Sequence, residues 1–189
     1  MIDNKLTELE TDFLRDLVTE APAILEFGAG PCTLTGIKYV KESYVVMDIS
    51  GPRLDHIRQL VDELNPTIEP IIFGAPIGTK WVKGRRRLNE GHHLVWDLPQ
   101  ARAANLIIFD CRLGLRWLLN ALIEAPRVAD FILHGFDEIE YETALNYIEE
   151  AAREGELIHF KRKAAPTGDL TLGAAHFLAH QDYEKSLVL

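Results

Sequence analysis

The segment Ala23–Thr33 constrains the fold of this chain more than any other part of its sequence. Its first five residues, Ala-Ile-Leu-Glu-Phe, form a short apolar run that is typical of a buried parallel strand. Gly28-Ala29-Gly30 follows directly, and the residues from Thr33 onward can begin a helix. Glycine suits such a turn because it tolerates positive φ and lets the backbone come close to a ligand. On its own, the turn fits either an ordinary strand-to-helix connection or the nucleotide-binding corner of a doubly wound α/β fold.

A second strand with an acid at its tip favours the nucleotide-binding alternative. Tyr44-Val45-Val46-Met47-Asp48 is apolar until its last residue, which is a carboxylate 18 residues after Gly30. An acid at the end of the second strand accepts hydrogen bonds from the ribose hydroxyls of an adenosine-type ligand. The two features together therefore predict an adenosine-type ligand at this corner.

The residues around the glycines favour one class of adenosine ligand over another. The dinucleotide fingerprint requires a third glycine three residues after the second, and Thr33 stands at that position. The run Glu-Phe-Gly-Ala-Gly-Pro-Cys-Thr instead resembles the first motif of the Rossmann-like methyltransferases that use S-adenosylmethionine. The resemblance implies that S-adenosylmethionine is the cofactor. It assigns the cofactor contacts to Glu26 for the ligand's amino group, Gly28 and Gly30 for its methionine end, and Asp48 for its ribose. Further candidates for cofactor contacts are Thr33, Ile49 and Asp110, the last because it ends a strand at the edge where open α/β sheets bind ligands.

The resemblance continues along the chain in two later motifs, Ile-Ile-Phe-Asp-Cys-Arg and Phe-Ile-Leu-His-Gly-Phe-Asp-Glu-Ile-Glu-Tyr. Both look like strand ends of a group of small bacterial methyltransferase-like proteins. Gly135 stands where that group carries an acid, which removes a carboxylate from the acceptor side of the site. We expect His134 to be the general base, because imidazole titrates near neutral pH, or else a structural histidine at a strand end. Arg112 either orients an anionic substrate or pairs with a neighbouring acid.

The order of predicted elements gives an α/β, Rossmann-like, doubly wound sheet of seven mostly parallel strands with a C-terminal antiparallel hairpin. Helical periodicity covers residues 5–20 and 50–64, and an apolar helix covers 113–125. Strands are predicted at 68–73, 106–110 and 129–133 in addition to the first two. A capping box of Asp137 and Glu140 predicts a helix over 138–154 that Gly155 ends. The last two strands are then predicted at 157–161 and 172–178.

Length and composition predict one domain over residues 1–189. The net charge of −9 argues against general binding to nucleic acids or acidic membranes. No signal peptide or membrane-spanning run is recognisable, and the two cysteines are expected to be reduced, so we expect a cytoplasmic protein. The sequence leaves open whether the chain forms a homo-oligomer.

Residues 74–104 are predicted to be an irregular basic insert or lid. The cations Lys80, Lys83, Arg85, Arg86 and Arg87 reverse the sign of the chain's charge there. They form either a solvated face or a platform for a small anionic acceptor. The adjacent His92 and His93 point in different directions on any regular element, so we predict no metal site.

Three functions remain open from the sequence. The first is methyl transfer from S-adenosylmethionine to a small, anionic acceptor. The second is binding of S-adenosylmethionine or S-adenosylhomocysteine without chemistry, which the glycine at position 135 favours. The third is an NAD-linked oxidoreductase, which Thr33 in place of the third glycine disfavours.

Overall fold

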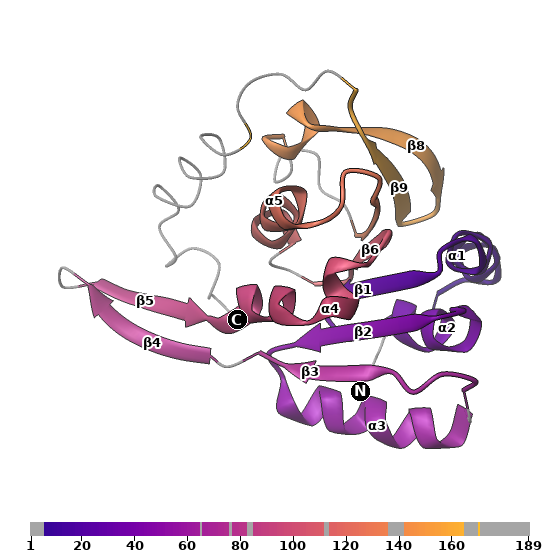
Figure 1. The fold of residues 1–189 in the computed structure, drawn as a ribbon, viewed down its shortest axis with the longest axis horizontal. Coiled ribbons are helices and arrows are strands. Elements are labelled where there is room, and N and C mark those ends of the chain that lie inside the picture. The colour runs from indigo at the N-terminus through magenta and orange to yellow at the C-terminus, as the bar shows by residue number, and fades with distance from the viewer. Residues whose placement is uncertain are drawn as a thin grey trace.

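The computed structural model describes residues 6–64, 66–75, 77–82, 85–111, 114–135, 142–164 and 170, and only the backbone within 77–93. Seven strands form one sheet in the order β3-β2-β1-β6-β7-β9-β8 (Figure 1). The first five in this order are parallel, and β9 runs antiparallel to both neighbours. The predicted Rossmann-like sheet with a C-terminal antiparallel hairpin is therefore confirmed. The strands are β1 (Ala23–Phe27), β2 (Ser43–Asp48), β3 (Ile71–Gly74), β6 (Leu106–Phe109), β7 (Asp130–His134), β8 (Ile148–Glu154) and β9 (Leu157–Arg162).

The central strands bury side chains on both faces, which is why their sequences are continuously apolar. On β1, for example, Ile24 packs into one core cluster while Leu25 and Phe27 pack into the other. Helices α1 (Glu8–Glu20), α2 (Pro31–Tyr39) and α3 (Gly51–Leu64) cover the first face. Helices α4 (Pro99–Arg102) and α5 (Gly114–Glu124), with the 3-10 helices η1 (Gly91–Asp97) and η2 (Ala144–Asn146), lie on the second. No helix within the described ranges is long and apolar enough to cross a lipid bilayer.

The strand order reverses direction between β1 and β6, and ligands of open α/β sheets bind outside the carboxyl ends of the strands at such a point. Phe27 and Phe109, the last residues of these two strands, are register partners. Their rings stack with centroids 5.2 Å apart and an interplanar angle of 3°. This stacking fixes the two strand ends beside each other below the glycine turn.

The C-terminal part of the sheet differs from the prediction. Residues 148–154 form strand β8, so the helix predicted over 138–154 is wrong for this segment. The alanines, glutamates and arginine of β8 favour a helix locally, but pairing with β9 decides the conformation, and β8 is an edge strand exposed along most of its length. Gly155, with φ of +56°, forms the turn of the hairpin. The predicted strand at 172–178 and the capping box of Asp137 and Glu140 lie outside the described residues.

The segment 74–104 is more regular than the sequence predicted. Strands β4 (Ile77–Val82) and β5 (Arg85–Glu90) pair as a separate antiparallel hairpin that projects beyond the main sheet (Figure 1). The register places Lys80 opposite Arg87. Further along, Trp96 and Ala101 are buried in the main core, so the end of this segment belongs to the domain interior. Short elements of six or seven residues carry no clear periodicity, which explains why sequence reasoning missed them.

Candidate functional site

The turn between β1 and α2 has a conformation that requires glycine at position 28. Gly28 has φ of +88°, and a Cβ there would lie 2.6 Å from Cβ of Cys111. Its N–H donates to the carbonyl oxygen of Met47 at 2.7 Å, which joins the turn to the end of β2. A Cβ at Gly30 would lie 2.5 Å from Cγ of Asp110. Both glycines therefore let the turn pass directly over the ends of β2 and β6.

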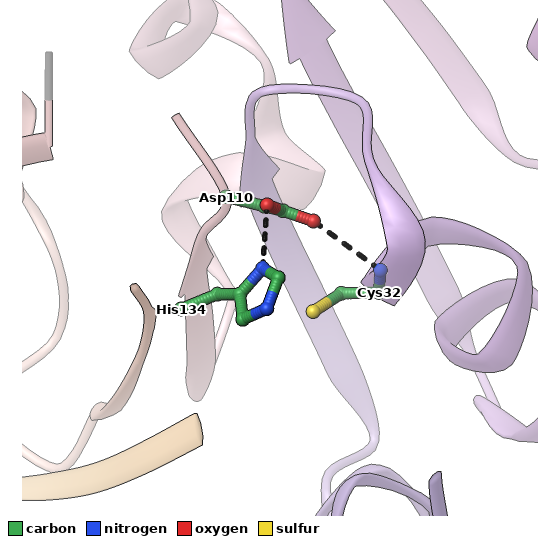
Figure 2. Close-up of side chains that lie close together, drawn as sticks. All are labelled: Cys32, Asp110 and His134. Carbon is green, nitrogen blue, oxygen red and sulfur yellow. Dashed lines mark hydrogen bonds and ion pairs between the residues drawn. The ribbon is translucent and has the colours of Figure 1, made fainter. Parts of the chain in front are cut away.

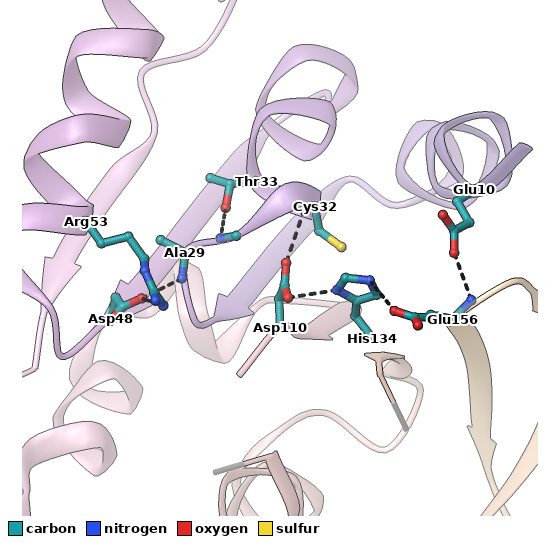
Figure 3. Close-up of polar contacts among 10 residues, drawn as sticks. Glu10, Ala29, Cys32, Thr33, Asp48, Arg53, Asp110, His134 and Glu156 are labelled. Atoms are coloured by element: carbon teal, nitrogen blue, oxygen red, sulfur yellow. Dashed lines mark hydrogen bonds and ion pairs between the residues drawn. The ribbon is translucent and has the colours of Figure 1, made fainter. Parts of the chain in front are cut away.

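Asp48 lies at the carboxyl end of β2 with its side chain turned toward this turn (Figure 3). Its Oδ2 accepts hydrogen bonds from Ala29 N at 2.9 Å and from Arg53 Nη1 at 3.3 Å, while Oδ1 accepts one from Ser50 N at 2.7 Å. A carboxylate offers about four acceptor positions, so Oδ1 retains capacity for one more donor. Arg53 is half-exposed and can move aside. The group fits the role of a ribose acceptor.

Glu26 lies beneath the turn rather than on its surface. The side chain is fully buried, and its Oε2 accepts a hydrogen bond from the hydroxyl of Tyr44 at 2.8 Å. Its other oxygen, Oε1, is buried and has no hydrogen-bond partner among the residues that the structure describes. Burial, and after it the charge of Asp110, raise the pKa of Glu26 well above its usual range, against the smaller effect of the hydroxyls of Tyr44 and Thr33. In this conformation Glu26 supports the site from below.

Asp110 and His134 form a hydrogen-bonded pair at the ends of the neighbouring strands β6 and β7 (Figure 2). Asp110 Oδ1 lies 2.9 Å from His134 Nδ1, and both side chains are 11% exposed. Asp110 Oδ2 accepts a hydrogen bond from Cys32 N, in the first turn of α2, at 3.3 Å. The pair therefore links the glycine turn to the end of β7.

The hydrogen bond from Asp110 is the main cause of a raised pKa at His134. Burial opposes the shift, and the charges of Asp110, Glu156 and Glu10 add to it. Gly135 beside His134 offers no carboxylate to increase the basicity of the histidine, and Asp110 supplies one from the adjacent strand instead.

A brace from α1 holds the other side of His134. The capping box of α1 joins Thr7 and Glu10, and Glu10 Oε1 also accepts a hydrogen bond from Glu156 N at 2.8 Å (Figure 3). This contact anchors the turn of the β8–β9 hairpin. Glu156 Oε2 then lies 3.6 Å from His134 Nε2. The imidazole thus stands between a nearly buried carboxylate on Nδ1 and an exposed one near Nε2.

A groove of about 330 Å³ opens beside this histidine. It lies next to the end of β7 and the turn of the β8–β9 hairpin. Its lining residues are Gly135, Arg153, Gly155, Glu156 and Ile158.

Cys32, Asp110 and His134 each bring one possible metal-ligand atom within 4.8 Å of the others. Asp110 and His134 already share a hydrogen bond, between Oδ1 and Nδ1. Burial, followed by the charge of Asp110, raises the pKa of the Cys32 thiol well above its usual range. A thiol needs to lose its proton to bind a metal or to act as a nucleophile, so this arrangement favours a neutral cysteine and a proton-sharing pair.

Comparison with solved structures identifies the architecture. No family model and no curated protein matches the sequence. A methyltransferase-like protein from Silicibacter pomeroyi superposes with a TM-score of 0.71 at 17% identity, over 91% of this chain and 95% of that one. The methyltransferase PaMTH1 from Podospora anserina, solved with bound SAH (S-adenosylhomocysteine), gives 0.62 at 10% identity, over 84% and 80%. An O-methyltransferase from Bacillus cereus in complex with SAH gives 0.54 at 14%, over 94% and 70%.

The chain has the class I methyltransferase fold. In this fold the strand order brings the ends of β2, β1, β6 and β7 to one edge, and the described site residues lie there. Of the residues predicted from the sequence, the edge holds Gly28, Gly30, Thr33, Asp48, Ile49, Asp110 and His134, whereas Glu26 lies below it. Arg112 and Lys83 lie outside the described residues, as do the side chains of Lys80, Arg85, Arg86 and Arg87.

Sequence reasoning missed three residues of the site in this methyltransferase fold: Cys32, whose N–H contacts Asp110, and the bracing pair Glu10 and Glu156. Glu10 and Glu156 are 146 positions apart in the chain. Glu10 was detectable as a capping-box residue of α1, because Thr7 precedes it by three positions. Its second contact depends on the turn of a hairpin that was predicted as a helix end.

Proposed function

We propose that this protein transfers the methyl group of S-adenosylmethionine to a small acceptor. The proposal rests on one observation: the glycine turn, Asp48 and the Asp110–His134 pair converge where the strand order reverses in a sheet of the methyltransferase fold. Fold alone does not define a reaction, so the residues at this edge carry the argument. The SAH-bound proteins that share the fold support the choice of ligand.

Asp48 and the glycine turn would hold the cofactor. Asp48 retains an acceptor position for a ribose hydroxyl on Oδ1, and the glycines let the turn pass close over the ends of β2 and β6, where the ligand's tail would lie beside it. Bound S-adenosylmethionine supplies an electrophilic methyl group on a positively charged sulfur. The chain contributes mainly alignment of the two reactants, and proximity of this kind accounts for about 7–11 kcal/mol of a barrier.

His134 would accept the proton that a hydroxyl or ammonium acceptor loses. Asp110 holds Nδ1, which fixes the ring and directs Nε2 away from the turn. Nε2 is then the atom that takes the proton, and the Asp110 carboxylate stabilises the resulting imidazolium. Glu156 near Nε2 is 70% exposed, so it can give way to an acceptor. The groove beside Gly135 and Glu156 offers the space for one.

We extend the proposal to an anionic acceptor. The support is the charge of the sequence: five cations lie between Lys80 and Arg87 in a chain of net charge −9. The backbone of this segment forms the β4–β5 hairpin, which can present cations beyond the sheet.

Binding of the cofactor without chemistry is the second candidate. Gly135 favours it, because the strand end that carries His134 has no acid of its own. Formation of S-adenosylhomocysteine over a panel of alcohol, amine and carboxylate acceptors distinguishes the two candidates, since only the enzyme releases product.

Replacing Asp48 by asparagine is expected to weaken S-adenosylhomocysteine binding by about 1.5–3 kcal/mol, the scale of hydrogen bonds to a charged group. Isothermal titration calorimetry measures the affinity, with NAD as the competing ligand class. Asp55→Asn is the matched control, because Asp55 is an exposed carboxylate on α3 that pairs with Arg58 at 2.6 Å. Equal affinity of parent and Asp48→Asn, or tighter binding of NAD than of S-adenosylhomocysteine, would count against the proposed site.

A further inference from the structure

The backbone amides of the Gly28–Thr33 turn are already used within the protein. Gly28 N donates to Met47 O, and Ala29 N donates to Asp48 Oδ2. Gly30 N donates a hydrogen bond to Thr33 Oγ1 at 2.9 Å, and Thr33 N donates one to Gly30 O at 3.2 Å. Pro31 has no N–H, and Cys32 N donates to Asp110 Oδ2. No amide of this turn is left for a ligand, although a helix N-terminus of this kind is a natural binding site for an anion.

The Asp110 carboxylate occupies that anion position. It lies in the space that a side chain at Gly30 would fill, with Cγ 2.5 Å from the site of the absent Cβ. It contacts the first turn of α2 through Cys32 N and is held from the other side by His134. Its side chain is 11% exposed, so the carboxylate is built into the turn.

A ligand whose amino-acid tail lies along this turn would bring a second carboxylate to the same place. S-adenosylmethionine and S-adenosylhomocysteine both end in such a tail, whereas 5′-methylthioadenosine and adenosyl thioethers with a 3-aminopropyl tail do not. Two carboxylates a few ångströms apart repel each other strongly where water is largely excluded. Asp110 attracts the ammonium of either tail, but only the aminopropyl tail brings this ammonium without a second carboxylate.

We propose that Asp110 is a specificity-determining residue that competes with a ligand's carboxylate for the N-terminus of α2. The site therefore prefers adenosyl ligands whose tail is cationic and lacks a carboxylate. S-adenosylmethionine binds with the Asp110 side chain turned out of the corner, at a cost in affinity. This inference rests on the adenosyl site of the proposed function and assigns the selectivity of that site to one residue.

Calorimetric titration of the parent protein with three ligands tests the inference: S-adenosylhomocysteine, its 3-aminopropyl thioether analogue and 5′-methylthioadenosine. The parent is expected to bind the aminopropyl analogue about tenfold or more tightly than S-adenosylhomocysteine, given the strength of charge interactions at short range. Asp110→Asn is expected to tighten S-adenosylhomocysteine about tenfold while it changes 5′-methylthioadenosine by less than about threefold. Asp130→Asn is the matched control, because Asp130 also pairs with a histidine, His159, at 2.9 Å, at the opposite end of β7.

The outcomes separate the inference from the function on which it rests. Tighter binding of S-adenosylhomocysteine than of the aminopropyl analogue by the parent overturns the inference and leaves the adenosyl site standing. So does an Asp110→Asn protein that loses affinity for all three ligands equally, since a structural role would produce that result. Absence of binding by every adenosyl ligand overturns the site itself. The parent measurements need no variant, so poor folding of Asp110→Asn leaves the test intact.

Discussion

Replacement of His134 by glutamine is expected to lower turnover about 10²–10⁴-fold, which is the range that removal of a general base produces. Glutamine retains an amide near Asp110 but does not titrate. The affinity for S-adenosylhomocysteine is expected to stay within about threefold of the parent, because the loss falls on kcat. Turnover is measured as S-adenosylhomocysteine released with an acceptor found in the panel.

His159→Gln provides the matched control for this variant. His159 is similarly buried and pairs with Asp130 at 2.9 Å, but Asp130 stands at the opposite end of β7 from His134. It should keep the parent's turnover. A His134→Gln enzyme as active as the His159→Gln enzyme would remove His134 from the chemistry.

The pH dependence of turnover provides a second test of the Asp110–His134 pair. A general base acts in its unprotonated form, so the raised pKa of His134 places the rising limb of kcat/KM above the ordinary value of 6.5. Asp110→Asn removes the main cause of that shift and should move the limb to lower pH. By linkage, the stability that protonated His134 provides is present below its unfolded pKa and is lost as pH rises through the folded one.

Replacement of Gly28 by alanine is expected to reduce the free energy of unfolding by about 2–5 kcal/mol. Positive φ costs an alanine about 1–2 kcal/mol, and overpacking against the end of β6 adds about 1–3 kcal/mol. The overlap involves Asp110 O, a backbone atom that cannot turn away, and Cβ of Cys111 at 2.6 Å. Urea denaturation followed by circular dichroism measures the change.

Two further glycines separate the contributions to this cost. Gly135 has φ of +68°, and no atom of a described residue lies within 4 Å of the position that a Cβ would take, so Gly135→Ala should lose only the conformational part, about 1–2 kcal/mol. Gly51 has neither strain nor a neighbour within 4 Å, and Gly51→Ala at the start of α3 should be neutral or stabilising by about 0.4–1 kcal/mol. Equal losses in Gly28→Ala and Gly135→Ala would show that close packing of the turn is not the cause.

The sequence predicted the part of the fold that local patterns determine. The apolar runs of β1, β2, β6 and β7 predicted the parallel core of the sheet. Three of these strands end in, or are followed by, a polar residue, and these residues are the predicted site residues Asp48, Asp110 and His134. These residues meet because parallel strands end at one edge. Strand β8 could not be predicted from local patterns, because its helix-forming residues adopt a strand only through pairing with β9.

The parts of the site that sequence reasoning missed depend on contacts between distant segments. The carboxylate that Gly135 does not provide is supplied by Asp110, which lies 24 positions away from His134 on a neighbouring strand. Glu26 has the residue type expected of a ligand-binding acid, but its place in the middle of a strand buried on both faces puts it under the turn. The motif therefore indicated which residue types belong to the site, but it did not predict whether their side chains are exposed.

The central claim is that an adenosyl cofactor binds where the strand order reverses, and a crystal structure of the protein grown with S-adenosylhomocysteine tests it most directly. We expect ribose oxygens within hydrogen-bond distance of Asp48, about 2.5–3.2 Å. We also expect the thioether tail along the Gly28–Thr33 turn, with the Asp110 carboxylate displaced from Cys32 N. Ligand density elsewhere on the molecule, or an unoccupied turn at saturating ligand, would show that the cofactor does not bind at this site.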